Sequence, residues 1–426
     1  MSDEREVPTG RLARLGRLVG VGARTGASLL LSRDGKGAAE HAAAVLGSLR
    51  GLAAKVGQMA SYVDGMVPDE HRESYERALG ALLSAAPKSS PAAIRGVVER
   101  ELGASIDTLF TRWDDAPLAS ASIGQVHVAQ LHDGREVAVK VQHPGIDRAI
   151  EADLRNAGLL EGLVGAIGPK ALNTKEVFAV ISQRFREELD YELEADRQER
   201  FIEIHAEDAA VRIPKVVRER SSKRVLTTEL ARGRTIDEAA TGPLERRRAH
   251  AEVLWRFVFR GNLVGAMFNA DPHPGNYLFH DDGTVTFLDF GCVQPLVDPE
   301  LGHARAAHRA ALRSDESGFR RAIAGMLGTR GGDFEHAVVE YVRRCFEPLF
   351  GSPFTIDRRY AAEVVRGFQD MRQFAMRRDK SFTGMPPALV FMNRLQFGFY
   401  SVLARFDVAV DYAALEREVL GRAGLL

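Results

Sequence analysis

Two short polar segments in the second half of the chain constrain its fold more than any other feature. Asp271-Pro-His-Pro-Gly-Asn276 is a Pro/Gly-rich turn with an aspartate at its start and an asparagine at its end. Leu288-Asp289-Phe290-Gly291 places a second aspartate at the end of an apolar run. Between them, Asp281-Asp282-Gly283 is typical of a tight turn between two strands. The sequence therefore predicts a β-hairpin from Asn276 to Gly291.

The order of these side chains resembles that of protein kinases, in which an Asp, an Asn and the Asp of an Asp-Phe-Gly supply a catalytic base and two magnesium ligands. Phosphoryl transfer needs positioning and charge neutralisation more than covalent chemistry from the protein. This order indicates that Asp271 orients or deprotonates the attacking hydroxyl group. Asn276 and Asp289 offer the oxygen ligands that Mg²⁺ prefers. Either segment alone would be open to chance occurrence, whereas the two in this order and spacing favour a site.

The first half of the chain supplies candidates for holding the nucleotide. Val137-Ala-Val-Lys140 predicts an apolar strand that ends in the kind of lysine that contacts the α- and β-phosphates in kinases. A lysine in this position is otherwise an ordinary surface charge. The loop before it carries alanine where a kinase has its first two glycines, and alanine restricts the approach of backbone N–H groups to phosphate. The alternative is an ordinary turn of small residues. The expected nucleotide contacts in this loop are Ala119, Ser120, Ala121, Ser122, Gly124 and Val126.

The segment Phe185–Phe201 contains neither glycine nor proline and predicts one acidic helix. A nucleotide-binding lysine of the kinase type requires a helical glutamate as its partner. Glu188 and Glu194 lie six residues apart and are expected on different faces, so that one helix could serve two lysines. A solvated face is the alternative for most of these charges. A second lysine occurs in Lys55-Val-Gly57-Gln58, in an alanine-rich helical stretch where these residues alone indicate no function.

With these segments in order, the chain resembles the UbiB/AarF family of atypical kinases. The resemblance covers about residues 38–300, motif by motif. In that family the Lys-x-Gly-Gln helix belongs to an N-terminal extension that folds over the active site. The resemblance therefore implies a regulatory role for Lys55 and Gln58, with Lys55 paired to Glu188 and Asp190.

The resemblance also implies the chemistry of the site. Glu194 would partner Lys140, and the cofactors would be ATP and Mg²⁺. In that family the alanine-rich loop is associated with ATPase-like behaviour, and the extension would exclude protein substrates. The expected substrate is a small lipophilic molecule, such as a quinone precursor or prenyl lipid. The enzyme would either phosphorylate this molecule or hydrolyse ATP. The alternative is a nucleotide-gated lipid-binding module without phosphoryl transfer.

One departure from the family pattern lies in the catalytic loop. The family has Phe-His-Ala-Asp, whereas this chain has Phe268-Asn269-Ala-Asp271. Asparagine can form hydrogen bonds in place of the histidine, so the loop is still expected to be held. His273 is interpreted as a packing or hydrogen-bonding residue, because Mg²⁺ prefers oxygen ligands.

The expected fold class is α+β, a protein-kinase-like two-lobe fold with a helical N-terminal extension and a mainly helical C-lobe. Its parts in chain order are a basic amphipathic or disordered arm (1–36), the helical extension (37–112), the N-lobe (113–232) and the C-lobe (233–426). Strands of the N-lobe are predicted at Val126–Leu131, Val137–Val141 and Val225–Glu229.

Glu229 precedes the turn Ala231-Arg-Gly-Arg234, which is interpreted as the hinge where backbone groups meet adenine. No Ala-Pro-Glu segment follows Gly291, and a helix-rich stretch is expected to begin near Pro299. A platform for protein substrates is therefore not indicated.

Composition excludes several classes of function. The net charge of −1 gives no drive toward nucleic acid. Cys292 and Cys345 suit a reducing cytoplasm rather than a disulfide framework. No apolar run reaches the roughly 18 residues of a membrane span, and the N-terminus lacks the features of a signal peptide.

Contact with a membrane surface is left open by the sequence. Arginine recurs between Arg11 and Arg24 with apolar residues between, which predicts a basic strip on an anionic membrane, a partly disordered arm or a helix packed on the kinase body. The expected location is the cytoplasm, with peripheral contact at the inner face of the membrane. The Phe/Met-rich stretch 385–406 could line a lipid cavity, but its helical spacing favours core.

Overall fold

The computed structural model describes residues 89–120, 123–152, 154, 182–183, 186–269, 271–329, 331–378 and 396–426. The chain divides into two compact units: unit 1 is Met1–Glu194 with Val216–Leu230, and unit 2 is Ala195–Lys215 with Ala231–Leu426. The expected arm (1–36) and the part of the extension before residue 89 lie outside the described residues. The division places Ala195–Lys215 with unit 2, and its later boundary falls two residues before the expected end of the N-lobe at 232.

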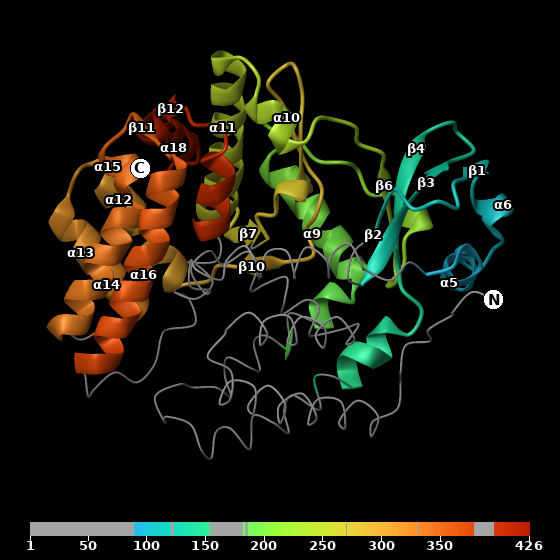
Figure 1. Ribbon diagram of the computed structural model, residues 1–426, viewed down its shortest axis with the longest axis horizontal. Coiled ribbons are helices and arrows are strands. Elements are labelled where there is room, and N and C mark those ends of the chain that lie inside the picture. Colours follow the sequence, from blue (N-terminus) through green and yellow to red (C-terminus); the bar gives the residue numbers. More distant parts are fainter. Residues whose placement is uncertain are drawn as a thin grey trace, which may run out of the picture. The chain divides into compact units, whose positions relative to one another are not determined.

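The described part of unit 1 is built on a five-stranded antiparallel sheet (Figure 1). Its strand order is β1 (Arg112–Trp113), β3 (Gly124–Gln130), β4 (Glu136–Gln142) and β6 (Val225–Glu229), and β2 (Ala119–Ser120) also pairs with β3. The three predicted strands are confirmed within two residues at each end. Because side chains alternate along a strand, the three valines of β4 are fully buried on one face while Lys140 lies on the other.

One face of this sheet is covered by α5 (Pro91–Leu102) and α6 (Ile106–Leu109). Ser90 caps the start of α5 and Pro91 occupies its first turn, where a missing backbone N–H has no consequence. Gly103 ends the helix at a φ of 70°. The apolar side of α5 packs on the β4 valines to form the core of unit 1.

The acidic segment is not the single helix that its composition predicts. Residues 186–188 are helical, the chain then breaks at Leu189 and Asp190, and α9 (Tyr191–Ile204) begins afterwards. The Tyr191 N–H donates to the Lys223 carbonyl over 3.0 Å instead of continuing a helix. The Asp190 carboxylate accepts from the Leu193 N–H and so caps α9. The prediction that Glu188 and Glu194 share one helix is therefore wrong.

Unit 2 contains the predicted hairpin. Its strands are β8 (Tyr277–Phe279) and β9 (Val285–Phe287), and β5 (Val211–Arg212) pairs parallel to β9. A second small sheet was not predicted: β7 (Met267–Asn269) pairs antiparallel with β10 (Val293–Pro295). The two sheets thus place the candidate catalytic segments beside paired strands.

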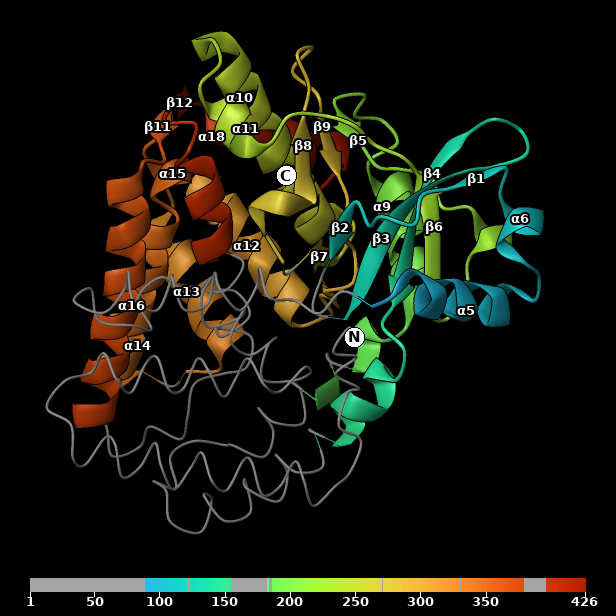
Figure 2. The same ribbon diagram turned by 45° about the vertical axis from the view of Figure 1, so that its right-hand side comes forward.

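Helices make up most of the rest of unit 2, which confirms its mainly helical character (Figures 1 and 2). They are α10 (Ile236–Ala240), α11 (Leu244–Phe259), α12 (Glu300–Leu312), α13 (Glu316–Leu327), α14 (Gly332–Cys345), α15 (Glu347–Phe350), α16 (Arg358–Arg378) and α18 (Tyr412–Arg422). The π-helical turn η2 (Arg260–Val264) follows α11, and two short strands, β11 (Phe354–Thr355) and β12 (Ala409–Val410), pair with each other. As predicted, a helix-rich stretch begins directly after Pro299.

The core of unit 2 is aromatic. Trp255 of α11 is 1% exposed, and its ring centroid lies 4.2 Å from that of Tyr412 and 4.3 Å from that of Phe259. Phe397 and Phe399 are also buried, so the part of the Phe-rich stretch within 396–406 belongs to the core, as its spacing favoured. No helix in the described ranges combines the length and apolar character needed to cross a bilayer.

Candidate active site

Lys140 and Glu194 form the central ion pair of unit 1. The Lys140 Nζ atom lies 2.7 and 2.9 Å from the two carboxylate oxygens of Glu194. Glu194 lies in the first turn of α9 and its side chain is 3% exposed, whereas that of Lys140 is 21% exposed. The Nζ atom also lies 5.0 Å from the centroid of the Tyr191 ring. The structure thus brings together the pair that the family resemblance implied.

The loop before Lys140 begins as a strand. Ala119 and Ser120 form β2 and pair with Val126 and Gln125 of β3. Gly124 lies so close to β4 that a Cβ atom there would come within 2.4 Å of the Val141 carbonyl oxygen. Close packing of the sheet therefore requires this glycine. The remaining two predicted contacts of the loop, Ala121 and Ser122, lie outside the described residues.

The acidic residues before α9 have a partner that sequence analysis missed. The Asp190 carboxylate lies 3.5 Å from the Lys223 Nζ atom. Lys55, the predicted partner of Glu188 and Asp190, and Gln58 are not among the described residues, so the implied pairing and the regulatory role stay predictions. The predicted hinge residue Glu229 ends β6, paired with Val137 of β4.

In unit 2 the Asp271 carbonyl accepts two hydrogen bonds from within the segment 271–276. This oxygen accepts from the His273 N–H over 2.7 Å and from the Asn276 Nδ2 atom over 3.1 Å. His273 Nδ1 accepts from the Gly275 N–H over 3.0 Å, so His273 is the hydrogen-bonding residue it was interpreted to be. Because the amide nitrogen of Asn276 is used within the loop, its side-chain oxygen remains the atom suited to a cation.

Asn269 holds the same loop to the Asp-Phe-Gly segment. Its Nδ2 atom donates to the Asp289 carbonyl over 2.6 Å, and its Oδ1 atom accepts from the Asp271 N–H over 3.1 Å. The asparagine therefore forms hydrogen bonds on both sides of its amide, as expected where the family has histidine. Its place in β7, paired with Val293 of β10, fixes its backbone.

The two predicted metal ligands belong to one hairpin. The Leu288 N–H donates to the Asn276 carbonyl over 3.0 Å, so Asn276 and Asp289 flank neighbouring strands. Asp289 Oδ1 accepts from the Gly291 N–H over 2.9 Å. Across the described ranges no three His, Cys, Asp or Glu side chains converge as a protein-only metal site. One carboxylate and one amide oxygen nevertheless fit Mg²⁺, which retains waters and binds substrate phosphates.

Burial shapes the surroundings of this hairpin. Tyr277 directly follows Asn276, and its burial raises its pKa, with a further increase from the Asp271 carboxylate. Its hydroxyl group therefore stays neutral at physiological pH. Phe290 is fully buried, with its ring centroid 5.1 Å from that of Phe201.

Arg197 is a residue near the Asp-Phe-Gly segment that sequence analysis missed. Its Nη1 atom donates to the Gly291 carbonyl over 3.0 Å, and the residue is 8% exposed. The available signal was its spacing of three residues from Glu194 and four from Phe201, which indicates one side of a helix.

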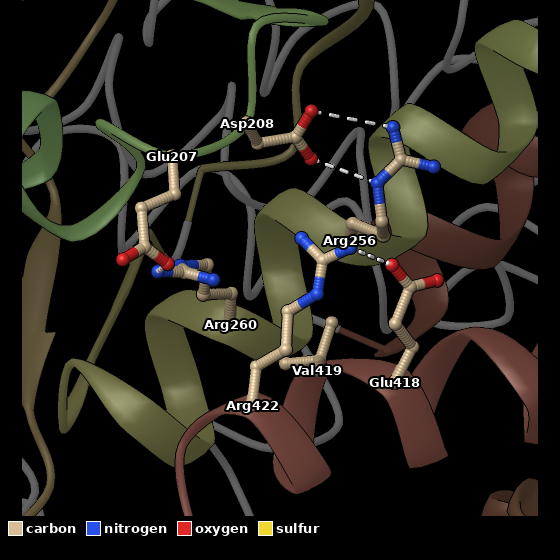
Figure 3. A pocket seen from close by; sticks show the side chains of 7 residues that line it. All are labelled: Glu207, Asp208, Arg256, Arg260, Glu418, Val419 and Arg422. Atoms are coloured by element: carbon tan, nitrogen blue, oxygen red, sulfur yellow. Dashed lines mark hydrogen bonds and ion pairs between the residues drawn. The ribbon is translucent and has the colours of Figure 1, made fainter.

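A separate pocket of about 220 Å³ in unit 2 contains none of these residues (Figure 3). It is lined by Glu207, Asp208, Arg256, Arg260, Glu418, Val419 and Arg422. Arg256 binds Asp208, Arg260 binds Glu207 and Arg422 binds Glu418. Its charges are thus matched within the protein.

The chain is similar to known proteins over most of its length. The ABC1 atypical kinase-like domain matches residues 81–321. The chain is 26% identical over 378 residues to the mitochondrial atypical kinase COQ8 of Saccharomyces cerevisiae, covering 87% of this chain and 74% of that protein. It is 29% identical over 397 residues to the mitochondrial atypical kinase COQ8B of Rattus norvegicus, covering 87% and 73%. An uncharacterized protein of Mycobacterium tuberculosis is 35% identical over 245 residues, 54% of this chain and 49% of its own.

A solved structure resembles this fold as well. It is the complex of the Mycobacterium tuberculosis protein Rv3197 with erythromycin, with a TM-score of 0.62 and 29% identity. The match covers 88% of this chain and 94% of that one. The chain therefore has a structural relative over most of its length.

Proposed function

The chain belongs to the family of ABC1 atypical kinase-like proteins, and on this premise we propose that it binds ATP with Mg²⁺ and transfers the γ-phosphoryl group to water or to a small lipophilic molecule. The α+β fold and the UbiB/AarF resemblance are both confirmed. The activity, cofactors and substrate are the proposal.

The ion pair of Lys140 and Glu194 is the observation that carries this proposal. A carboxylate that is 3% exposed requires a partner, and both of its oxygens lie within 2.9 Å of the Lys140 Nζ atom. The glutamate thereby fixes an ammonium group on a sheet strand, facing away from the core. A lysine held in this way is what kinase-type sites use to orient nucleotide phosphates.

The roles in unit 2 follow from its hydrogen bonds. Asp271 would orient the attacking hydroxyl group or water, because its loop is closed by His273 and Asn276. Asn276 and Asp289 would hold Mg²⁺, which when bound neutralises charge on the nucleotide phosphates. The Glu229 backbone and the loop of residues 119–126 would contact the nucleotide.

The class of substrate is inferred from the family. The UbiB/AarF resemblance implies quinone or isoprenoid-lipid metabolism, and two of the relatives are named mitochondrial atypical kinases. The structural relative in complex with erythromycin supports a small organic molecule as the kind of ligand. We infer a cytoplasmic protein with peripheral membrane contact.

A nucleotide-gated lipid-binding module is the second candidate. Ala119 and Ser120 are paired as a strand, and alanine restricts the approach of backbone N–H groups to phosphate, which favours binding over rapid phosphoryl transfer. The two candidates differ in whether bound ATP is consumed.

Turnover of ATP by the purified full-length chain tests the proposal. It is measured with Mg²⁺, with and without anionic liposomes and a quinone-precursor-like phenol. We expect stimulated turnover that Asp289→Asn abolishes, because the amide cannot neutralise the metal charge. Asp282→Asn is the matched control, because Asp282 lies at the turn of the same hairpin and pairs with Arg212. Equal turnover in Asp289→Asn and the wild type would refute the site, and tight Mg-ATP binding without turnover would favour the binding module.

A further inference from the structure

Arg197 is a buried cation with a specific acceptor. It is 8% exposed in the first half of α9, and its Nη1 atom donates to the Gly291 carbonyl over 3.0 Å in a buried hydrogen bond. A guanidinium stays charged when buried, so its removal from water is tolerated only with well-placed acceptors. Selection of an apolar residue at this position would avoid that penalty. The Gly291 carbonyl is one acceptor that meets this requirement.

The segment that receives this bond is fixed on both sides of Phe290. Asn269 donates to the carbonyl of Asp289, and Arg197 donates to the carbonyl of Gly291. Between these two bonds, the Phe290 ring is fully buried beside Phe201. Phe201 lies four residues after Arg197, so one side of α9 supplies both the cation and the aromatic contact.

Gly291 is the residue whose freedom this arrangement limits. Its N–H donates to Asp289 Oδ1 over 2.9 Å and so orients the carboxylate. Glycine has the widest choice of backbone conformations, and a rotation at Gly291 would carry that N–H away from Asp289. Holding the carbonyl of the same residue restrains this rotation. Arg197 thus acts on the Asp289 carboxylate through the backbone of Gly291.

We propose that Arg197 is a positioning residue that sets the orientation of the Asp289 carboxylate for Mg²⁺ through the Gly291 carbonyl. The inference rests on the proposed function, because it assumes that Asp289 holds the metal. Arg197 lies three residues from Glu194 on the same helix, so α9 carries both the partner of the nucleotide lysine and the residue that positions the metal ligand.

The binding of ATP to the full-length chain, in Mg²⁺ and in EDTA, tests this role by calorimetry. The variants are Arg197→Met, which removes the donors, and Arg197→Lys, which keeps a charge and one donor group. Arg200→Met is the matched control, because Arg200 lies on the same helix, is 55% exposed and pairs with Glu203. For Arg197→Met we expect the Mg²⁺-dependent gain in ATP affinity to fall by about 10- to 100-fold, the usual effect of losing a residue that orients a metal ligand. Affinity in EDTA should stay within about twofold, Arg197→Lys should be intermediate, and Arg200→Met should match the wild type.

The outcomes separate the inference from the proposed function. A wild-type chain whose ATP affinity does not depend on Mg²⁺ would contradict the proposed function, and the inference with it. A wild type that shows the gain, with Arg197→Met retaining it in full, would overturn the inference alone. If Arg197→Met fails to fold by circular dichroism, Arg197→Lys decides. If Arg197→Lys loses ATP affinity equally in Mg²⁺ and in EDTA, the role of Arg197 is merely structural and the proposal is overturned.

Discussion

Lys140 and Glu194 differ in how far their charged side chains are exposed to solvent. The Glu194 side chain is 3% exposed, whereas that of Lys140 is 21% exposed. A charge left without its partner in the interior is strongly destabilising, while one that can reach water is much less so. The pair therefore predicts an asymmetry between its two halves.

Replacement of Lys140 should destabilise the protein more than replacement of Glu194. We expect Lys140→Met to lower the free energy of unfolding by about 3–5 kcal/mol, because it removes the cation that pairs with both oxygens of a buried carboxylate. Glu194→Gln should produce a smaller loss, because the Lys140 ammonium can be hydrated. Urea denaturation measures both. Equal decreases in the free energy of unfolding, or a larger decrease in Glu194→Gln, would contradict the argument that burial makes an unpaired Glu194 more costly than an unpaired Lys140.

His205 predicts a dependence of stability on pH. Burial and, to a smaller extent, the Arg260 guanidinium together lower the pKa of its imidazole to about 3, against the attraction of Asp208. The ring stacks on Phe257 at 4.7 Å, and neither of its nitrogens has a hydrogen-bond partner in the described part of the chain. The unfolded chain protonates this imidazole below pH about 6.5, whereas the folded chain does so only below pH about 3. The free energy of unfolding therefore decreases as the pH is lowered through that window.

The variant His205→Phe should remove this dependence. Between pH 7 and pH 5 the wild type should lose about 2 kcal/mol more of its free energy of unfolding than His205→Phe does, from about 1.4 kcal/mol per pH unit below the unfolded pKa. Because burial also lowers the pKa of His127 and of His250, the difference between the two proteins is the quantity to measure. Parallel pH profiles in denaturant titrations would refute the role of His205.

At the scale of elements, the sequence predicted the helices and strands that depend on neighbouring residues, and it missed those that depend on distant ones. The strands β3 and β4 alternate, β6 is rich in β-branched residues, and the hairpin has an Asp-Gly turn, so these elements could be predicted. The break before Tyr191 could not, because it depends on the Lys223 carbonyl, more than thirty residues away. The pairing of β7 with β10 joins three-residue strands that are too short to show a period.

The candidate site follows the same division. Motif order indicated Lys140, Asp271, Asn276 and Asp289, because those residue types carry the chemistry themselves, and the family resemblance added Glu194. Arg197 and Lys223 act on backbone or on a cap, and their types are compatible with a solvated surface. Only the fold shows that Arg197 is buried against Gly291.

The close approach of β3 to β4 predicts an intolerance at Gly124. A Cβ atom there would lie 2.4 Å from the Val141 carbonyl oxygen and 2.9 Å from the Tyr191 hydroxyl group, so the strands must shift. We expect Gly124→Ala to destabilise the protein by about 1–3 kcal/mol. Gly96→Ala is the control, because its new Cβ atom would meet only the end of the flexible Arg100 side chain and helix α5 would gain up to about 1 kcal/mol. Similar unfolding midpoints for the two variants would contradict the packing argument.

At the scale of the whole molecule, the proposed function draws on residues of both units. Unit 1 contains the Lys140–Glu194 pair, and unit 2 contains Asp271 with the hairpin of Asn276 and Asp289. The proposed function requires both sets of residues. If the proposed function is correct, a substitution of a catalytic residue should lower ATP turnover without weakening ATP binding.

Asp271→Asn should make that separation. The amide keeps the shape of the side chain and leaves the backbone carbonyl that closes the loop, so Mg-ATP affinity should change by less than about threefold. Turnover should fall by at least about 100-fold, because a general base or orienting carboxylate contributes that much. Calorimetry and a coupled phosphate assay measure the two quantities. If Asp271→Asn loses no turnover, or supports function in cells as well as the wild type does, the nucleotide-gated module becomes the better account.

Binding of ATP to the purified full-length chain, with and without Mg²⁺, tests the central claim most directly. The account predicts that the wild type binds ATP and that Mg²⁺ tightens the binding. Lys140→Met should weaken binding in both conditions, whereas Asp289→Asn should lose the tightening alone. A wild type that does not bind ATP, or an Asp289→Asn variant that keeps the full effect of Mg²⁺, would contradict it.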